Sequence, residues 1–356
     1  MMLHPTSVTA PSLPVPAQAV EVDAVALPGT GVPDLGGEQV GDVTGAAAML
    51  SPAERRVRRL NLIAVITPMV GLGAAMWLAW GSAFNWTQAI IFVVMVEATA
   101  LGVTAGYHRL FTHRAFATVG WIKYALGALG SMSVQGTVLE WCAIHRVHHQ
   151  HSDDHDDPHS PHSHEHGSWG EGMAGLVRGF WHAHTGWLFR GRQRGLGKYV
   201  RDLSSDPVTL AVNRDFRWWV YAGLVIPAVA GGVLEGTWWG AYMGFLWGGL
   251  VRILFVHHVT WSINSVCHLW GTRAFRTGDE SRNNAFIGVL TLGEGWHNNH
   301  HAFPTSARHG LAWWQLDVTY GFIRGLEMVG LAWNVRRPDV GRVEAKRVGA
   351  ASKAAE

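Results

Sequence analysis

Cysteine is scarce in this 356-residue chain, which has only Cys142 and Cys267. Two thiols cannot hold an iron–sulfur cluster, which usually needs four cysteine ligands. Both stand beside histidine-rich stretches that we expect to face a reducing cytosol, and this disfavours a disulfide between them. The sequence also has no flavin motif. Any electrons for redox chemistry must therefore come from another protein.

Charged residues are also few. They make up 15% of the chain and leave a net charge of +2, whereas 48% of the residues are hydrophobic and 19 are tryptophan. A net charge this close to zero gives no case for binding nucleic acid. Tryptophan favours membrane interfaces, so this composition indicates a membrane protein.

The first fifty residues contain no basic side chain, because no lysine or arginine precedes Arg55. A secretory signal starts with basic residues, so residues 1–50 do not match one. They are rich in alanine, valine, proline and glycine without a sustained period, which predicts a disordered acidic tail. The string Ser51-Pro52-Ala53-Glu54 then predicts a helix start, since serine can cap and proline suits the first turn.

No charge at all occurs between Leu60 and Val96. This run is too long for one membrane-spanning helix and right for two of ~20 residues, with a turn near 81–86. Two further apolar runs are joined by a short turn at 235–237. The predicted fold is an all-α integral membrane protein with four transmembrane helices in two hairpins, at about 60–80, 86–106, 218–234 and 238–256.

The loops predict how the chain is oriented. Arginines precede the first and third spans, and uncharged or acidic turns follow them, so both termini and the polar regions should be cytoplasmic. Residues 107–216 and 257–335 would form a helical cytosolic cap on the membrane domain, 51–335. Within the cap, we expect residues 119–139 to form one helix that lies on the membrane or dips into it. We expect residues 195–215 to form an exposed connection. Residues 336–356 predict a basic tail, solvated or near anionic lipid.

Glu97 is an ionisable residue within the second predicted span. Such groups are costly in a membrane and often functional. The alternative is a structural role, in which the carboxyl, ionised or protonated, hydrogen-bonds a neighbouring helix, and the sequence leaves both interpretations open.

Histidine, by contrast, recurs at helical spacing. His297, His300 and His301 stand at i, i+3 and i+4, as do His145, His148 and His149, so each trio shares one helix face. His108 and His113 are about 140° apart on an ideal helix, so the helix must end or distort between them if both bind metal. Asn264 and His268, at i and i+4, follow the fourth span as His108 and His113 follow the second.

Nine imidazoles are too many for one metal ion and suit two. Imidazole binds zinc, copper, iron and nickel, so the ligand type alone does not choose the metal. The two hairpins can bring all of these side chains to one cytosolic surface. The predicted ligands of this di-metal site are His108, His113, His145, His148, His149, His268, His297, His300 and His301.

Several strings resemble those of the membrane fatty acyl desaturases, the stearoyl-CoA desaturase group. Residues 102–110 are similar to that family's first histidine box. Glu140-Trp141 and Asp157-Pro158-His159 are similar to the start and end of its second box. Residues 264–268 and 293–304 resemble the remaining metal-binding segments, and the similarity runs from about 51 to 335. In that family nine histidines hold two irons, and an asparagine, here Asn264, reaches one of them through water.

The resemblance implies an oxygen-dependent reaction that removes two hydrogens from adjacent methylenes and leaves a cis double bond. The expected substrate is a saturated long-chain acyl-CoA, desaturated at the Δ9 position. The expected cofactors are two irons, with O₂ as co-substrate. Zinc can replace iron in a purified sample, but it has no redox chemistry. The electron donor would be a ferredoxin or a cytochrome b5-type protein with its reductase, and the expected location is a bacterial plasma membrane.

The resemblance also assigns the substrate tunnel. By family position, Gln135, Trp141, Thr260 and Trp261 would line or bend an apolar tunnel for the acyl chain. Val96 and Ala100 would lie near its closed end. Interfacial anchoring is the alternative for the two tryptophans, and ordinary helix packing is the alternative for Val96 and Ala100.

Two departures from the animal members concern the acyl carrier. Animal members have an Arg-Asp pair where this chain has Ala143-Ile144, so one expected contact to coenzyme A is absent. Residues 160–170 instead resemble bacterial and plant members, some of which act on acyl chains of intact lipids. A basic stretch has two open interpretations, a site for coenzyme A phosphates or lipid headgroups and a merely solvated segment. Its residues are Arg190, Arg192, Arg194 and Lys198.

Other functions remain as alternatives. A membrane hydroxylase of alkanes or fatty acids has a similar histidine-rich centre and would yield an alcohol rather than an alkene. The histidine-rich string 159–166 suggests a zinc transporter as a further alternative. Such a protein needs ionisable residues in several spans, however, and only Glu97 lies deep within a predicted span. That string lacks regular ligand spacing, so it predicts a flexible loop that binds metal weakly.

Overall fold

Four helical segments are long and apolar enough to cross a membrane in the computed structural model, which describes residues 52–80, 85–190 and 195–349. The described residues all belong to the unit Gln39–Glu356. The predicted all-α fold class is therefore confirmed. The predicted tail at 1–50, most of the turn at 81–86, and Arg192 and Arg194 lie outside the described residues.

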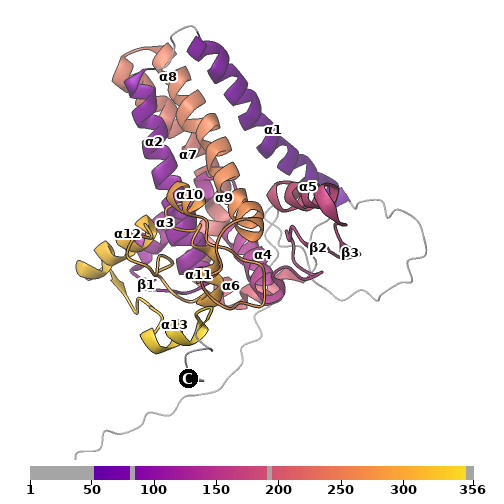
Figure 1. The fold of residues 1–356 in the computed structure, drawn as a ribbon. Helices are drawn as coiled ribbons and strands as arrows, with labels where there is room; N and C mark the ends of the chain where they lie inside the picture. Colours follow the sequence, from indigo (N-terminus) through magenta and orange to yellow (C-terminus); the bar gives the residue numbers. More distant parts are fainter. Residues whose placement is uncertain (1–51, 81–84, 191–194, 350–356) are drawn as a thin grey trace, which may run out of the picture. The chain divides into compact units, whose positions relative to one another are not determined.

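The four spanning segments are longer than predicted. They are α1 (Pro52–Trp80), α2 (Trp86–Leu101) continued by the π-helix η1 (Gly102–Thr112), α7 (Pro207–Glu235), and α8 (Trp238–Gly244) continued by the π-helix η4 (Phe245–Val251) and α9 (Arg252–Leu269). The second and fourth segments thus carry the chain without a break from the membrane into the histidine-rich region (Figure 1).

Side-chain caps fix where these helices begin. Asn85 accepts a hydrogen bond from the backbone N–H of Gln88, and Asp206 accepts one from the N–H of Thr209. Pro207 occupies the first turn after Asp206, where its missing N–H costs nothing. The exposed connection predicted for 195–215 is therefore wrong from residue 207 onward, because α7 has already begun there.

Residues 119–139 form two elements rather than one helix. α3 (Gly120–Met132) ends before a turn in which Val134 and Gly136 both have positive φ, and α4 (Val138–His151) then begins with Thr137 as its cap. α3 packs against α2, η1 and α7. The prediction of a single helix missed this turn, whose backbone conformation cannot continue a helix.

Small residues let the helices approach closely. A Cβ on Gly231 would lie 2.1 Å from the carbonyl oxygen of Gly240, and one on Gly102 would lie 2.2 Å from the backbone nitrogen of Gly130. Helix contacts of this kind bring α7 against α8 and η1 against α3.

Replacing Gly102 with alanine should destabilise the protein by about 1–3 kcal/mol, because the new methyl group meets backbone atoms of α3 that cannot rotate away. Thermal unfolding in detergent measures the effect. Gly73→Ala on α1 is the matched control, since nothing lies within 4 Å of a Cβ there. Equal melting temperatures for both variants would contradict the close η1–α3 contact.

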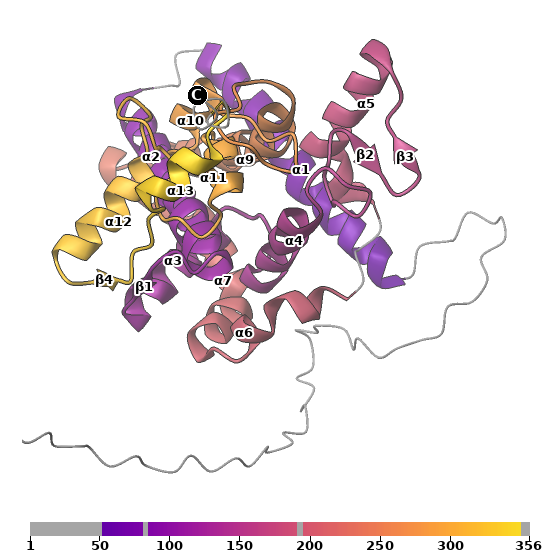
Figure 2. The same cartoon turned by 60° about the horizontal axis from the view of Figure 1, so that its bottom comes forward.

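The remaining elements form a helical cap at one end of the spanning segments (Figures 1 and 2). Two short antiparallel sheets pair β1 with β4 and β2 with β3. The elements are β1 (Ala117–Thr118), β2 (Ser163–His164), β3 (Gly167–Ser168), α5 (Gly172–His184), η2 (Gly186–Phe189), η3 (Leu196–Val200), α6 (Arg201–Ser204), α10 (Ala285–Leu290), α11 (His297–Ala302), α12 (Val318–Met328), β4 (Ala332–Trp333) and α13 (Val340–Lys346).

The described part of the C-terminal tail is held against the cap rather than solvated throughout. The backbone N–H of Arg336 donates to the carbonyl of Ala115, at 2.8 Å. The Lys346 ammonium donates to the carbonyl of Ala302, at 2.7 Å. These contacts tie residues 336–346 to segments on both sides of the histidine-rich region.

Candidate metal centre

The nine histidines come together in two buried or half-buried groups. In each group, one ligand atom from every residue lies within 4.8 Å of those from the others. The first histidine group is His108, His113, His145, His149 and His300, and the second histidine group is His148, His268, His297 and His301.

A π-helix solves the spacing problem of His108 and His113. In η1 the backbone N–H of His113 donates to the carbonyl of His108, at 3.1 Å, which is the i to i+5 hydrogen bond of a π turn. This wider turn brings residues five apart onto one face, and the two ring centroids lie 4.8 Å apart. The distortion expected from the 140° offset is therefore present.

Helices α4 and α11 each serve both groups. On α4, His145 and His149 belong to the first histidine group and His148 to the second. On α11, His300 belongs to the first, whereas the second takes two residues one turn apart, His297 and His301. The two helices thus lie between the groups and fix the distance from one to the other.

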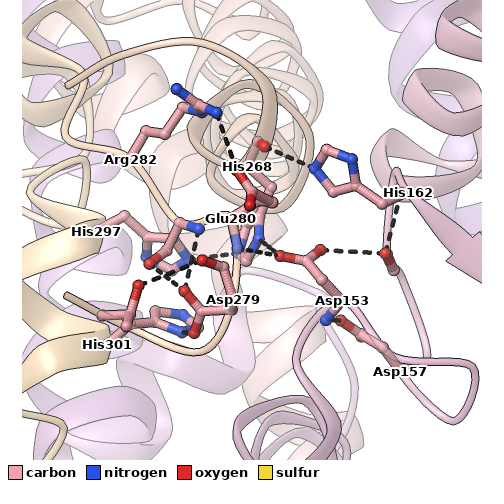
Figure 3. A network of polar contacts seen from close by, with 12 residues as sticks. Asp153, Asp157, His162, His268, Asp279, Glu280, Arg282, His297 and His301 are labelled. Carbon is pink, nitrogen blue, oxygen red and sulfur yellow. Dashed lines mark hydrogen bonds and ion pairs between the residues drawn. The ribbon is translucent and has the colours of Figure 1, made fainter. Parts of the chain in front are cut away.

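Buried carboxylates orient four of the histidines, at least one in each group. The Nδ1–H of His108 donates to Glu294 at 2.7 Å, and that of His148 donates to Asp157 at 3.0 Å. In the second histidine group, Figure 3 shows the same arrangement for His268 with Asp153, at 2.8 Å, and for His301 with Asp279, at 2.6 Å. A carboxylate that binds Nδ1–H in this way leaves the Nε2 lone pair free for a metal.

These carboxylates are ionised in the folded protein. Burial raises the pKa of Asp153 and Asp157, but the facing imidazoles His268 and His148 lower it further, so both pKa values fall below the usual range. The pKa of Asp279 is likewise lowered by His301 against the effect of burial. Each imidazole therefore faces a full negative charge and holds its Nδ1 proton.

The geometry fits a metal in each group. His268 Nε2 lies 3.0 Å from His297 Nε2, and His300 Nε2 lies 2.8 Å from His149 Nε2. Two imidazole nitrogens about 2.1 Å from one ion and roughly 90° apart would lie about 3.0 Å from each other. Within the two groups, three further Nε2 atoms are buried and have no hydrogen-bond partner among the described residues, and these belong to His113, His148 and His301.

Comparison with known proteins identifies a family that shares this segment of the chain. A model of the family described as fatty acid desaturase matches residues 84–334, which include every histidine of both groups. The chain belongs to the fatty acid desaturase family. Members of this family are di-iron oxidoreductases, and the two histidine groups of this desaturase can hold metal.

Individual relatives differ in the substrates that their names state. The chain is 41% identical to a hex-5-enoyl-[acyl-carrier protein] acetylenase of Moorena producens, over 80% of this chain and 87% of the relative. It is 37% identical to an sn-1 stearoyl-lipid 9-desaturase of Anabaena variabilis, over 72% of this chain and 87% of the relative. It is also 37% identical to an icosanoyl-CoA 5-desaturase of Limnanthes douglasii, over 72% of this chain and 67% of the relative.

The side chains predicted to line the acyl tunnel lie beside the first histidine group. Gln135 links two others, because its Nε2–H donates to Thr260 at 3.0 Å and its carbonyl accepts from Trp141 Nε1 at 3.3 Å. The Trp141 ring stacks on His145, with centroids 5.0 Å apart. Trp261 is buried on α9, one residue after Thr260. This desaturase thus links Gln135, Trp141 and Thr260 beside the first histidine group, whereas the ring of Trp261 packs against His257 and His258.

The other predicted residues are more dispersed. Val96 and Ala100 are buried on α2, whereas Glu97 is exposed between them on the face that carries Val93 and Val94. Asn264 lies half-buried one turn before His268 on α9, and its contact with a metal through water stays a prediction.

Both described basic residues of the 190–198 stretch lie over aromatic rings, and their contact with a lipid headgroup or coenzyme A phosphate stays a prediction. Arg190 stacks over the ring of Trp169, at 4.9 Å from its centroid, and Lys198 lies 4.9 Å from the ring centroid of Tyr199. They stand at the end of η2 and within η3.

Sequence reasoning missed the orienting residues Asp153, Asp279 and Glu294, and it missed His309. His309 Nδ1 lies 3.0 Å from Glu294, and its ring centroid is 4.5 Å from that of His300. These residues stand far from their partners in the sequence, so no spacing rule points to them. The available signals were two family strings, 157–159, which contains Asp157, and 293–304, which contains Glu294.

Proposed function

We propose that the protein is an oxygen-dependent di-iron desaturase that introduces a cis double bond at the Δ9 position of a saturated long-chain acyl-CoA. The observation that carries this proposal is the pair of buried all-imidazole groups, each with carboxylates bound to the outer ring nitrogens. Removing hydrogen from an unactivated methylene needs a redox metal and oxygen, which zinc alone would not supply.

The nine histidines would hold the two irons through their ring nitrogens, with Asn264 reaching one iron through water. When bound, the irons supply the oxidising power for removing two hydrogens with O₂. The protein's own contribution is to orient the ligand rings, through carboxylates such as Asp153 and Glu294. The linked side chains of Gln135, Trp141 and Thr260 would hold the reacting carbons beside the first histidine group.

The expected setting is a bacterial plasma membrane, with both termini and the metal centre on the cytoplasmic side. A ferredoxin or a cytochrome b5-type protein with its reductase would supply the electrons. The four arginines near the start of α1 support this orientation under the positive-inside rule.

An acyl chain of an intact lipid is the second candidate substrate. On α4, Ala143 is buried and Ile144 is half-buried, and neither side chain offers a charged group to coenzyme A. The stearoyl-lipid desaturase of Anabaena variabilis adds support from a relative. A hydroxylase would share the metal centre, but it would give an alcohol in place of the alkene.

Expression in cells that lack unsaturated lipids tests the function. We expect a new cis double bond, located by mass spectrometry at carbon 9 of long acyl chains. Purified protein with acyl-CoA or with acyl lipid, an electron donor and O₂ then identifies the carrier. Hydroxylated chains, or no product from either carrier in the presence of bound iron, would contradict the proposal.

Ala100→Trp should shift the product profile toward shorter chains, because the indole would fill the end of the tunnel that we propose beside α2. Val94→Trp is the matched control, since Val94 lies on the same helix but is 58% exposed and faces away from the packed side. Chain-length profiles of the products, measured by gas chromatography, decide the question. Identical profiles for Ala100→Trp and the unmodified protein would remove Ala100 from the tunnel.

A further inference from the structure

Helix α5 presents an apolar stripe outward from the cap. Met173, Val177 and Trp181 are four residues apart and therefore share one face of this 13-residue helix. Their exposed fractions are 73%, 57% and 62%. The sequence analysis assigned no role to this segment, which lies between the histidine-rich string and the basic stretch.

The opposite face of α5 is held firmly. A Cβ on Gly175 would lie 2.0 Å from the carbonyl oxygen of Gly170, and one on Gly179 would lie 1.9 Å from that of Pro161, so the preceding loop packs directly on the helix backbone. At the C-terminal end, His184 Nδ1 lies 3.0 Å from Ser265 Oγ on α9. The helix is therefore fixed with its apolar stripe pointing away from the protein.

The position of α5 relates this stripe to the membrane. The helix runs into η2, where the carbonyl of Leu188 accepts a hydrogen bond from Asn61 Nδ2 on α1, at 2.7 Å. Asn61 stands at the start of the first spanning segment, next to the exposed Leu60 and close to Ile63. Figure 1 shows α5 at the level of this end of α1, lying across the direction of the spanning helices.

The basic side chains near the start of α1 and on α5 are complementary in charge to an anionic membrane surface. Four exposed arginines begin α1, and Arg178 is exposed on α5 beside Val177. A helix with an apolar face and neighbouring basic residues binds in the interface plane of a bilayer, and each basic residue near anionic lipid adds about 1 kcal/mol. The arginines of α1 are Arg55, Arg56, Arg58 and Arg59.

We propose that α5 is an in-plane membrane anchor, with Met173, Val177 and Trp181 inserted at the boundary between headgroups and acyl chains of an anionic bilayer. The stripe continues the lipid-facing surface of α1. Its three side chains expose on the order of 400 Å², well below the ~800 Å² that each partner buries in a stable protein interface. The bilayer, rather than a second copy of the chain, is therefore the occupant. This inference is independent of the substrate and of the bound metal.

Site-directed fluorescence on the full chain in phosphatidylglycerol-containing vesicles tests the anchor. Val177→Cys receives an environment-sensitive fluorophore, and the natural Cys142 and Cys267 do not compete because both are buried. Glu165→Cys, between β2 and β3 with a side chain 69% exposed, is the matched control. We expect the label at 177 to be blue-shifted, quenched by lipids with shallow nitroxides, and quenched several-fold less by aqueous iodide than the label at 165.

Equal iodide quenching at 177 and 165, without quenching by nitroxide lipids, would overturn the proposal. Protection from both quenchers together with disulfide cross-linking between chains at residue 177 would also overturn it, because a second copy would then cover the stripe. Met173→Cys, one turn earlier on the same face, repeats the measurement if the first variant does not fold.

Discussion

Replacing His300 with alanine should abolish desaturation while leaving the protein inserted in the membrane. His300 Nε2 lies 3.1 Å from His108 Nε2 and 2.8 Å from His149 Nε2, so its imidazole is at the centre of the first histidine group. Removing an outer partner of a metal ligand typically costs 10–100-fold, and we expect the loss of a ligand to exceed ~100-fold. Product formation and iron content per chain measure the two effects, and iron should fall from about two to about one ion.

His166→Ala is the matched control for this experiment. It also removes one imidazole, but from an exposed position next to Glu165, outside both groups. Activity and iron content should match those of the unmodified protein. Full iron content with retained activity in His300→Ala would remove His300 from the ligand set and contradict the proposed centre.

The second large effect is expected at Glu294. Burial would raise the pKa of this carboxyl, but Arg109 and the neighbouring imidazoles lower it well below its usual range, so it is ionised. It accepts hydrogen bonds from His108 at 2.7 Å and from Arg109 at 2.9 Å. Glu294→Gln removes one of the two carboxylates that face the buried Arg109 guanidinium, and Asp317, at 2.9 Å, is the one that stays. Breaking a buried pair of this kind costs up to roughly 3–5 kcal/mol.

Iron titration and thermal unfolding of Glu294→Gln measure this effect. We expect a lower melting temperature and 10–100-fold weaker iron binding at one of the two sites, since His108 loses the acceptor that fixes its ring. Glu280→Gln is the control, because that side chain is 42% exposed and pairs with Arg273 and Arg282 at the surface. A melting temperature and an iron affinity unchanged in Glu294→Gln would show that the carboxylate does not orient His108.

The features of the site that depend on neighbouring residues could be predicted from the sequence. The i, i+3, i+4 spacing of His297, His300 and His301 depends only on helix geometry, and α11 carries all three. The distortion between His108 and His113 followed from the same geometry, although a π-helix is one of several ways to produce it. Long apolar runs identified all four spanning segments, because membrane hydropathy is a property of contiguous residues.

Spacing rules could not predict the contacts of Glu294 and Asp153, because these contacts join distant parts of the chain. Glu294 is 186 residues from His108, and Asp153 is 115 residues from His268. Each looks like an ordinary acidic residue in a polar loop until the fold brings the imidazole to it. The break between α3 and α4 was missed for another reason, since Val134 adopts a positive φ that its side chain does not favour.

The π-helix η1 makes the segment between α2 and His113 more sensitive to deletions than to substitutions. A π turn contains more residues than the α turn it replaces, so the register between α2 and His113 is set by a residue count. Exchanging one apolar side chain for another preserves that count, whereas deleting a single residue rotates everything beyond it by about 100°. Between Trp86 and His113, a one-residue gap would therefore be more damaging than many substitutions, even if it left the segment equally apolar.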